Sequence, residues 1–126
     1  FIELPSNLIK RGELNLYQVE RAFVGKCIAF TNRKEFKDYY DLSFLVSKTK
    51  IGSFPKKKEA AELLDQVIEI AEKEDMEKMF RLAFSNVDLK FKNLKSSQLH
   101  RFIEKTNRKL RVMVNKLRGQ ERQQNS

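Results

Sequence analysis

The 126-residue chain has little of what many enzyme active sites need, since it holds one cysteine, one histidine and four glycines. A single cysteine excludes an intramolecular disulfide and a cysteine metal cluster. His100 has no second histidine or nearby acidic pair, so no metal site is predicted there. The sequence has no Ser-His-Asp order and no nucleophile elbow, which argues against a hydrolase. Only Gly52 is followed by serine and no Asp-x-Asp pair occurs, so a glycine-rich phosphate loop is absent.

Long apolar runs are also missing. No stretch of about 18 apolar residues occurs, so the sequence predicts no membrane-spanning segment. The first residues lack the basic-then-apolar order of a signal peptide. Cys27 lies in the apolar run of residues 27–30 and is predicted to be a buried small hydrophobe. A lone reduced cysteine is typical of the cytoplasm, which is the compartment we expect.

What the chain has in excess is positive charge, with a formal net charge of +9. Residues 1–50 carry nine Lys and Arg against six Asp and Glu, and residues 51–95 carry nine of each. Residues 96–126 carry eight against two, so most of the excess lies at the C-terminal end. Such an excess attracts polyanions by releasing counterions from phosphates. It also suits an acidic protein partner or serves solubility, and these interpretations remain open.

The apolar pattern predicts an all-α fold of about five helices. Apolar residues recur at threes and fours over residues 15–31, 35–46, 56–73, 75–84 and 96–117. The short connection between the first two helices predicts a helical hairpin, followed by a small bundle. We expect residues 1–14 to be a short N-terminal strand remnant and a linker, and 15–118 to be the helical domain. Gly119 is expected to end the last helix, which leaves 119–126 as a disordered tail.

One feature of the last predicted helix is a heptad seam with one polar position. Its spacing alternates four and three over Leu99, Ile103, Thr106, Leu110, Met113 and Leu117. Such a seam packs in the core or forms a homodimer interface. The homodimer requires these side chains to be exposed in the monomer.

The residues with candidate chemistry lie in the predicted hairpin. Lys26 interrupts the apolar pattern of the first helix, and Asp38 and Asp41 share a face one turn apart in the second. In a functional interpretation Lys26 neutralises phosphate, and Asp38 acts as a general base or orients Lys26. In a structural one, Asp38 and Asp41 favour the start of their helix or pair with Lys26, Arg33 or Lys37 to close the hairpin. Asp41, Arg33 and Lys37 are expected to be mainly structural. Two carboxylates are too few for a Mg²⁺ site, so no metal ligands are predicted in this sequence.

The same region carries a family resemblance. Residues 20–26 and 32–42 hold ERAFVGK and NRKEFKDYYDL, and together they resemble the C-terminal half of AbiEii/AbiGii-type nucleotidyltransferase toxins. These are minimal nucleotidyltransferase-fold proteins of bacterial and archaeal toxin–antitoxin and phage-defence systems. The resemblance covers about residues 15–46. Lys26 and Asp38 have family-like spacing, and Lys37 stands where the family usually has arginine.

The resemblance implies a function that the chain does not complete alone. It makes the chain the helical C-terminal portion of an enzyme that transfers a nucleoside monophosphate to an acceptor such as RNA. Lys26 and Asp38 would be its catalytic residues. The chain begins at Phe1, and we expect a missing N-terminal half to carry the Gly-Ser motif and the Asp-x-Asp metal ligands. The intact protein would use Mg²⁺ and a nucleoside triphosphate. The fragment alone would bind neither and be inactive. A cognate antitoxin is an implied partner.

The last helix offers a second candidate site. Most of its cations lie off the apolar seam, and the candidates for nucleic-acid contact are Arg101, Lys105, Arg108, Lys109, Arg111 and Lys116. They form either a solvated basic face or a track for an RNA backbone. Phe102 is the one aromatic residue among them and is predicted to point inward, so base-specific contacts are not indicated. The alternative function is therefore a non-enzymatic helical module that binds RNA or an acidic protein partner.

Overall fold

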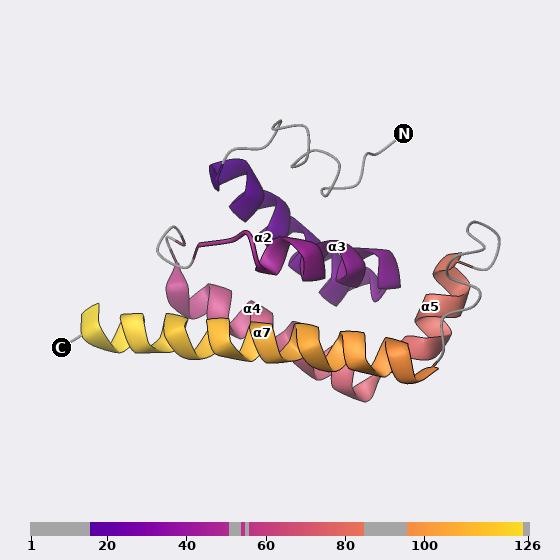
Figure 1. The fold of residues 1–126 in the computed structure, drawn as a ribbon. Coiled ribbons are helices and arrows are strands. Elements are labelled where there is room, and N and C mark those ends of the chain that lie inside the picture. The colour runs from indigo at the N-terminus through magenta and orange to yellow at the C-terminus, as the bar shows by residue number, and fades with distance from the viewer. Residues whose placement is uncertain (1–15, 51–53, 55, 85–95, 125–126) are drawn as a thin grey trace.

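The computed structural model describes residues 16–50, 54, 56–84 and 96–124. These residues form five helices and no strand, which confirms the predicted all-α fold (Figure 1). The helices are α2 (Leu16–Arg33), α3 (Phe36–Val46), α4 (Lys57–Lys73), α5 (Met76–Phe84) and α7 (Ser96–Gln124). The predicted strand remnant at residues 1–14 lies outside the described residues. None of the described helices is long and apolar enough to cross a membrane.

Helices α2 and α3 form the predicted hairpin. The inward face of α2 is fully or almost fully buried at Val19, Phe23, Cys27 and Phe30. Helix α2 continues two residues beyond its predicted end, because the Lys34 amide still donates to the Phe30 carbonyl oxygen at 2.8 Å. Only Lys34 and Glu35 separate the two helices. The hairpin is therefore tight, and this fixes which side chains of α2 face which side chains of α3.

The turn of this hairpin rests on Lys34, whose φ of 53° is in the left-handed region. A side chain in that region costs roughly 1 kcal/mol or more, which glycine avoids. We expect Lys34→Gly to be about 1 kcal/mol more stable than Lys34→Ala. Both variants lose the exposed ion pair of Lys34 with Glu74, so its contribution cancels in the comparison. Urea unfolding of the two variants measures the difference, and equal stabilities would contradict this account of the turn.

Helices α4 and α7 lie side by side along most of their length (Figure 1). Helix α4 buries Ala61, Leu64, Val67, Ile68 and Ala71. The facing surface of α7 buries the predicted seam, namely Leu99, Ile103, Thr106, Leu110, Met113 and Leu117. The seam is therefore covered within the chain, and the condition for a homodimer through the last helix is not met.

The end of α7 differs from the prediction. The helix passes Gly119 and continues to Gln124, so the predicted end at Gly119 and a disordered tail from that residue are wrong for residues 119–124. A glycine inside a helix costs only about 1 kcal/mol relative to alanine. The arginine, glutamine and glutamate residues around Gly119 are good helix formers and outweigh that cost.

Helix α3 is fixed to α7 by one buried side chain, Tyr39. Its hydroxyl donates to Asn107 Oδ1 at 2.8 Å and lies 3.2 Å from the Ile103 carbonyl oxygen. Burial raises the pKa of Tyr39, and a hydrogen bond with Thr106 opposes that shift. Because Tyr39 follows Asp38 in the chain, this contact sets the position of the α3 turn that carries the candidate carboxylates.

Helix α5 packs against α3 near the turn of the hairpin. The Phe80 ring meets the edge of Phe36 with the ring centroids 5.2 Å apart. Asp75 caps the helix, since its Oδ1 accepts from the Lys78 amide at 3.0 Å. The hairpin is thus held at its turn by α5 and along its length by α4 and α7.

Candidate active site

Four charged side chains form an ion-pair cluster between α2 and α3. The Lys26 ammonium lies 2.9 Å from Asp41 Oδ2 and 3.8 Å from Asp38 Oδ1. The Arg33 Nη2 group donates to both oxygens of Asp38, at 2.9 and 3.1 Å. The structure therefore brings together Lys26, Asp38, Asp41 and Arg33, four of the five residues predicted for this region.

The register of the hairpin explains which cation of α2 pairs with which aspartate of α3. Lys26 and Arg33 are two turns apart on α2 and lie on one side of it, while Asp38 and Asp41 are one turn apart on α3. Since the chain reverses at residues 34–35, the residue of α2 closest to the turn faces the first aspartate. Lys26, farther back, faces the second. Of the two aspartates that were predicted as possible partners of Lys26, Asp41 is the closer one.

The carboxylates of the cluster lie inside and the cations lie outside. Asp38 and Asp41 are 2% and 4% exposed, whereas the Lys26 and Arg33 side chains are 26% and 57% exposed. Burial raises the pKa of Asp41, the hydrogen bond and charge of Lys26 lower it, and the charge of Asp38 raises it further. The net shift is upward, so Lys26 does not fully offset the burial of the Asp41 carboxylate.

This shift predicts how stability depends on pH. A folded-state pKa above the ordinary 3.8 means that the protonated Asp41 is favoured in the folded chain. The contribution of the protonated Asp41 to stability is fully present below pH 3.8, and it is lost as the pH rises through the raised pKa. We therefore expect the free energy of unfolding of Asp41→Asn, relative to that of the wild type, to be higher at about pH 7 than at about pH 3. Urea unfolding of both proteins at the two pH values measures this, and a difference that stays constant would contradict the shift.

Lys37, the fifth predicted residue, lies apart from the cluster. It is exposed, and no ion pair joins it to a carboxylate in the part of the chain that the structure describes. With Arg33 and Lys34 it lines a cavity of about 450 Å³ whose other wall comes from Met79, Leu82 and Ala83 of α5. Lys37 therefore does not help to close the hairpin through an ion pair with the aspartates.

The cluster does not offer a complete magnesium site. Within residues 16–50, 54, 56–84 and 96–124, no three Asp, Glu, His or Cys side chains gather to hold a metal ion. Mg²⁺ prefers octahedral oxygen coordination. The two carboxylates present already bind Lys26 and Arg33. Any Mg²⁺ used by this protein therefore needs ligands from outside the described helices.

The comparison with protein families decides the class of the protein. The family described as nucleotidyl transferase AbiEii toxin, type IV TA system, matches residues 2–123. The chain belongs to the AbiEii nucleotidyltransferase toxin family. The match includes all five described helices except the last residue of α7, and it confirms the resemblance that rested on about residues 15–46. Because the family is that of a toxin–antitoxin system, an antitoxin is the implied partner. No curated protein and no solved structure matches the chain.

The basic residues predicted for nucleic-acid contact in this AbiEii-family chain fall into two groups. Arg111 pairs with Glu72 of α4, and Lys109 Nζ donates to Ser47 Oγ at the end of α3 at 3.0 Å. A further cation of α7, Arg118, pairs with Asp65 of α4. The remaining predicted residues are exposed, namely Arg101, Lys105, Arg108 and Lys116.

The spacing of charged residues in the sequence indicates the pairing of α7 with α4. Asp65 and Glu72 are seven residues apart on α4, and Arg111 and Arg118 are seven apart on α7. In two antiparallel helices, equal spacing of this kind brings both pairs into contact. Arg111, predicted for nucleic-acid contact, therefore takes part in the pairing of α7 with α4.

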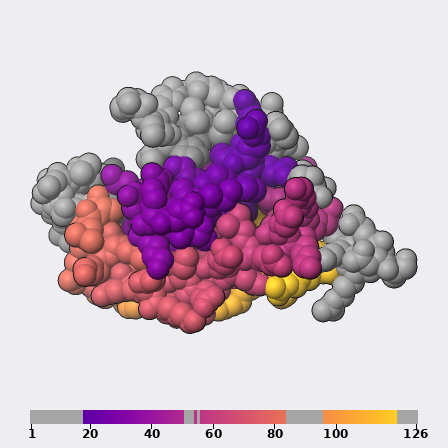
Figure 2. Space-filling model, turned by 180° about the vertical axis from the view of Figure 1, so that it is seen from behind, coloured from indigo at the N-terminus to yellow at the C-terminus, as the bar shows by residue number. Residues whose placement is uncertain are grey.

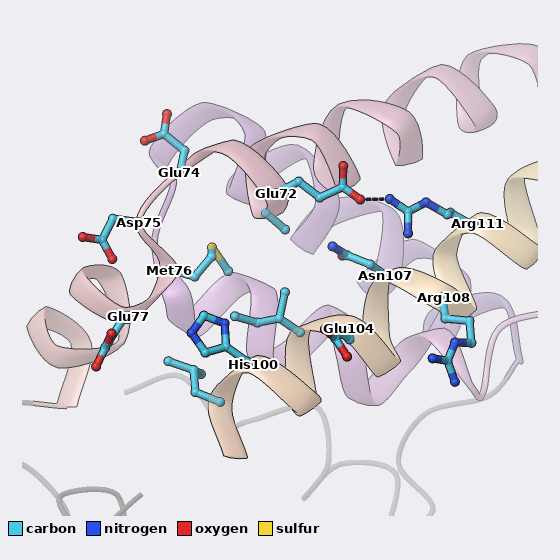
Figure 3. Close-up of a pocket in the computed structure, with 13 residues that line it drawn as sticks. Glu72, Glu74, Asp75, Met76, Glu77, His100, Glu104, Asn107, Arg108 and Arg111 are labelled. Atoms are coloured by element: carbon cyan, nitrogen blue, oxygen red, sulfur yellow. Dashed lines mark ion pairs between the residues drawn. The ribbon is translucent and has the colours of Figure 1, made fainter. Parts of the chain in front are cut away.

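A cavity of about 460 Å³ lies where the end of α4 and the start of α5 meet α7 (Figure 3). Its rim is charged, and several of its charged residues have partners within the chain. Figure 3 shows the pair of Glu72 with Arg111 at one end. Glu74 binds Lys34 at 3.0 Å, and Glu77 binds both Arg81 and Ser96. These pairs help to hold the AbiEii-family fold together.

Proposed function

We propose that this chain contributes Lys26 and Asp38 to a nucleotidyl transfer site. In the reaction, a hydroxyl oxygen of an acceptor such as RNA bonds to the α-phosphorus of a nucleoside triphosphate, and the bond to pyrophosphate breaks. Mg²⁺ would neutralise the phosphates, with its ligands supplied by residues outside the described helices. Without those residues the described helices would be inactive. The observation that carries the proposal is the lysine ammonium, partly exposed and held by two buried carboxylates.

Lys26 is suited to bind phosphate. Its ammonium is a compact charge, and its partial exposure leaves one side open to a ligand. Asp41 holds it at 2.9 Å, so the charge is positioned before a nucleotide arrives. Neutralising the oxygens of a phosphoryl group during transfer is the main task of such a residue.

Asp38 is better suited to orient the cations than to take a proton. Both of its oxygens accept from Arg33, and it is 2% exposed, so an acceptor hydroxyl would have to displace Arg33 or Lys26 to reach it. A general base must lie within hydrogen-bond reach of the proton that it removes. We therefore assign Asp38 the role of orienting the cations and not that of a general base.

The test is nucleotide transfer by the full-length protein, with Mg²⁺, labelled nucleoside triphosphates and RNA. We expect Lys26→Met to lower the rate by about 100-fold to 1,000-fold, the loss typical for removing one preorganised charge at a phosphoryl centre. The matched control is Lys73→Met, which removes an exposed lysine paired with Glu69 on α4 and is expected to keep the rate. Equal rates for Lys26→Met and the wild type would rule out the site.

The alternative of a non-enzymatic binding module is favoured by one observation, the exposed cations of α7 for which the described residues offer no ion pair. It predicts that the full-length protein binds RNA or an acidic protein and transfers no nucleotide to any acceptor. The transfer assay therefore separates the two functions. Binding without transfer would establish the module.

A further inference from the structure

Three polar side chains are buried where α3 packs against α7, and we call them the Tyr39 triad, defined as Tyr39, Thr106 and Asn107. They are 0%, 4% and 3% exposed. The Tyr39 hydroxyl donates to Asn107 Oδ1 at 2.8 Å and is also hydrogen-bonded to Thr106. The neighbouring residues on this face of α7, Ile103 and Leu110, are apolar and buried. Because a buried hydrogen bond adds little net stability where an apolar side chain would also pack, the orientation that the triad imposes explains it better.

Helix α7 gives the triad a firm anchor. It lies in front in Figure 1 and is largely covered by α4 and α5 when the molecule is seen from behind (Figure 2). The ion pair of Arg111 with Glu72 ties α7 to α4, and Asn107 lies one helical turn before Arg111. The Asn107 side chain is therefore a fixed partner for the Tyr39 hydroxyl.

The ring of Tyr39 is packed by three other aromatic rings. Its centroid lies 5.3 Å from that of Phe30, 6.2 Å from that of Phe36 and 6.0 Å from that of Phe102. Aromatic pairs are favourable over centroid separations from about 4.5 to 7 Å, so ring packing tolerates small movements. A hydrogen bond weakens steeply when its angle departs from the preferred range. The hydroxyl of Tyr39, and not its ring, therefore fixes the rotation of α3 about its axis.

The rotation of α3 decides where both candidate carboxylates lie. Tyr39 leaves the helix about 100° from Asp38 and about 160° from Asp41, so it anchors the side that faces away from the ion pairs. Side chains reach about 5 to 6 Å from the axis of a helix, so a rotation of about 10° moves each carboxylate by about 1 Å. Such a shift is large against the 2.9 Å contacts that hold Lys26 and Arg33 to these carboxylates.

We propose that Tyr39 is a positioning residue for nucleotidyl transfer, because its hydroxyl, held by Asn107, sets the rotation of α3 that places the Lys26 ammonium. The inference rests on the proposed function, in which that ammonium neutralises phosphate. In this role Tyr39 contacts neither the nucleotide nor the acceptor and acts through Asp41, which lies 2.9 Å from Lys26. A misplacement of about 1 Å costs as much as about 100-fold in rate, so the loss of one buried hydroxyl is measurable in the kinetics.

The test is Tyr39→Phe in the full-length protein, assayed for transfer of labelled nucleotides to RNA with Mg²⁺. Phenylalanine keeps the ring and removes only the hydroxyl. We expect kcat to fall by about 10-fold while KM for the nucleotide changes by less than about twofold, because Lys26 neutralises phosphate mainly in the transition state.

The matched control is Val114→Ala, which truncates a buried side chain of α7 outside the triad. Urea unfolding identifies conditions in which both variants are fully folded, and there Val114→Ala is expected to keep kcat within about twofold of the wild type. Equal losses of kcat in the two variants would overturn the proposal, because any weakening of the α7 interface would then have the same effect.

A double variant separates positioning from stability. Tyr39→Phe leaves the buried Asn107 side chain without its partner, whereas Tyr39→Phe/Asn107→Leu removes both partners, which can be nearly neutral for stability. We expect the stability of the double variant to return close to that of the wild type and its kcat to stay at least about fivefold lower. If kcat recovers together with stability, the triad only stabilises the fold and the proposal fails.

A measurement without substrate keeps this outcome apart from that of the transfer assay. If Tyr39 positions the ion pairs, Lys26→Met raises the equilibrium constant for unfolding by a smaller factor in the Tyr39→Phe background than in the wild type, and we expect about a fivefold difference. Equal factors would contradict the positioning role. Unequal factors in a full-length protein that transfers no nucleotide would support the positioning of the ion pairs and remove the reaction. Transfer by Tyr39→Phe at the wild-type rate would leave the reaction and overturn the inference.

Discussion

Replacing Lys26 with methionine is expected to lower the free energy of unfolding by about 3 kcal/mol at neutral pH. Methionine keeps the length and packing of the side chain but leaves Asp41, which is 4% exposed, without its partner at 2.9 Å. A buried charge without a partner is strongly destabilising. The loss should shrink toward about pH 4, because protonated Asp41 needs no cation. Urea unfolding at several pH values measures both effects.

A second substitution separates this stability effect from function. Lys26→Met/Asp41→Asn removes the stranded charge, so we expect it to regain most of the lost stability while remaining inactive in nucleotide transfer. If the double variant is as unstable as Lys26→Met, the loss does not come from the Asp41 carboxylate. If it regains activity together with stability, Lys26 has only a structural role in the hairpin.

The other large effect is expected in the seam between α4 and α7. Leu110 is fully buried there, and Leu110→Ala is expected to cost about 3 to 4 kcal/mol through lost burial and a residual cavity. The control on the same helix is Val112→Ala, which is expected to cost less than about 0.5 kcal/mol because Val112 is 48% exposed. Chemical denaturation of both variants gives the comparison.

The seam experiment also tests whether α7 packs within its own chain. A loss of stability that depends on protein concentration would show that Leu110 packs against a second copy, contrary to the structure. A loss that is the same at all concentrations agrees with packing against α4. Val112→Ala is again the control. Because the Val112 side chain is exposed, its truncation would reduce stability only if an assembly covered the outer face of α7.

The sequence predicted the helices well, because each has a clear apolar stripe. It placed α3, α4 and α5 within one residue of their observed bounds. The predicted end of α7 at Gly119 is wrong, because the helix continues to Gln124. Glycine ends a helix when the chain turns into the left-handed region. In this chain the left-handed region is occupied by Lys34, and a lysine gives no signal in the sequence for that backbone conformation.

The sequence predicted four members of the ion-pair cluster, but it wrongly included Lys37 and left the pairing open. The one-turn spacing of Asp38 and Asp41 shows that they share a face, yet it does not say which of them lies opposite Lys26. That depends on where the chain reverses, and α2 runs to Arg33 rather than stopping at residue 31. A shift of two residues at the turn changes the partner of Lys26.

The role of the seam was open for a different reason. A four-three spacing of apolar residues suits any long helical partner, whether from the same chain or from another. Only the matching seven-residue spacings of Asp65 with Glu72 and of Arg111 with Arg118 distinguish α4 as that partner. Charge patterns between helices thus carried information that the apolar pattern of one helix lacked.

Cys27 gives the chain a built-in reporter. It is the only cysteine, it is fully buried in α2 one residue from Lys26, and burial raises the pKa of its thiol. Within these 126 residues a thiol reagent therefore reacts at one place and only after α2 opens, since the reactive thiolate forms once water reaches it. The labelling rate measures the opening of the helix that carries Lys26 without any engineered probe. A nucleotide that engages the hairpin would slow the labelling of Cys27.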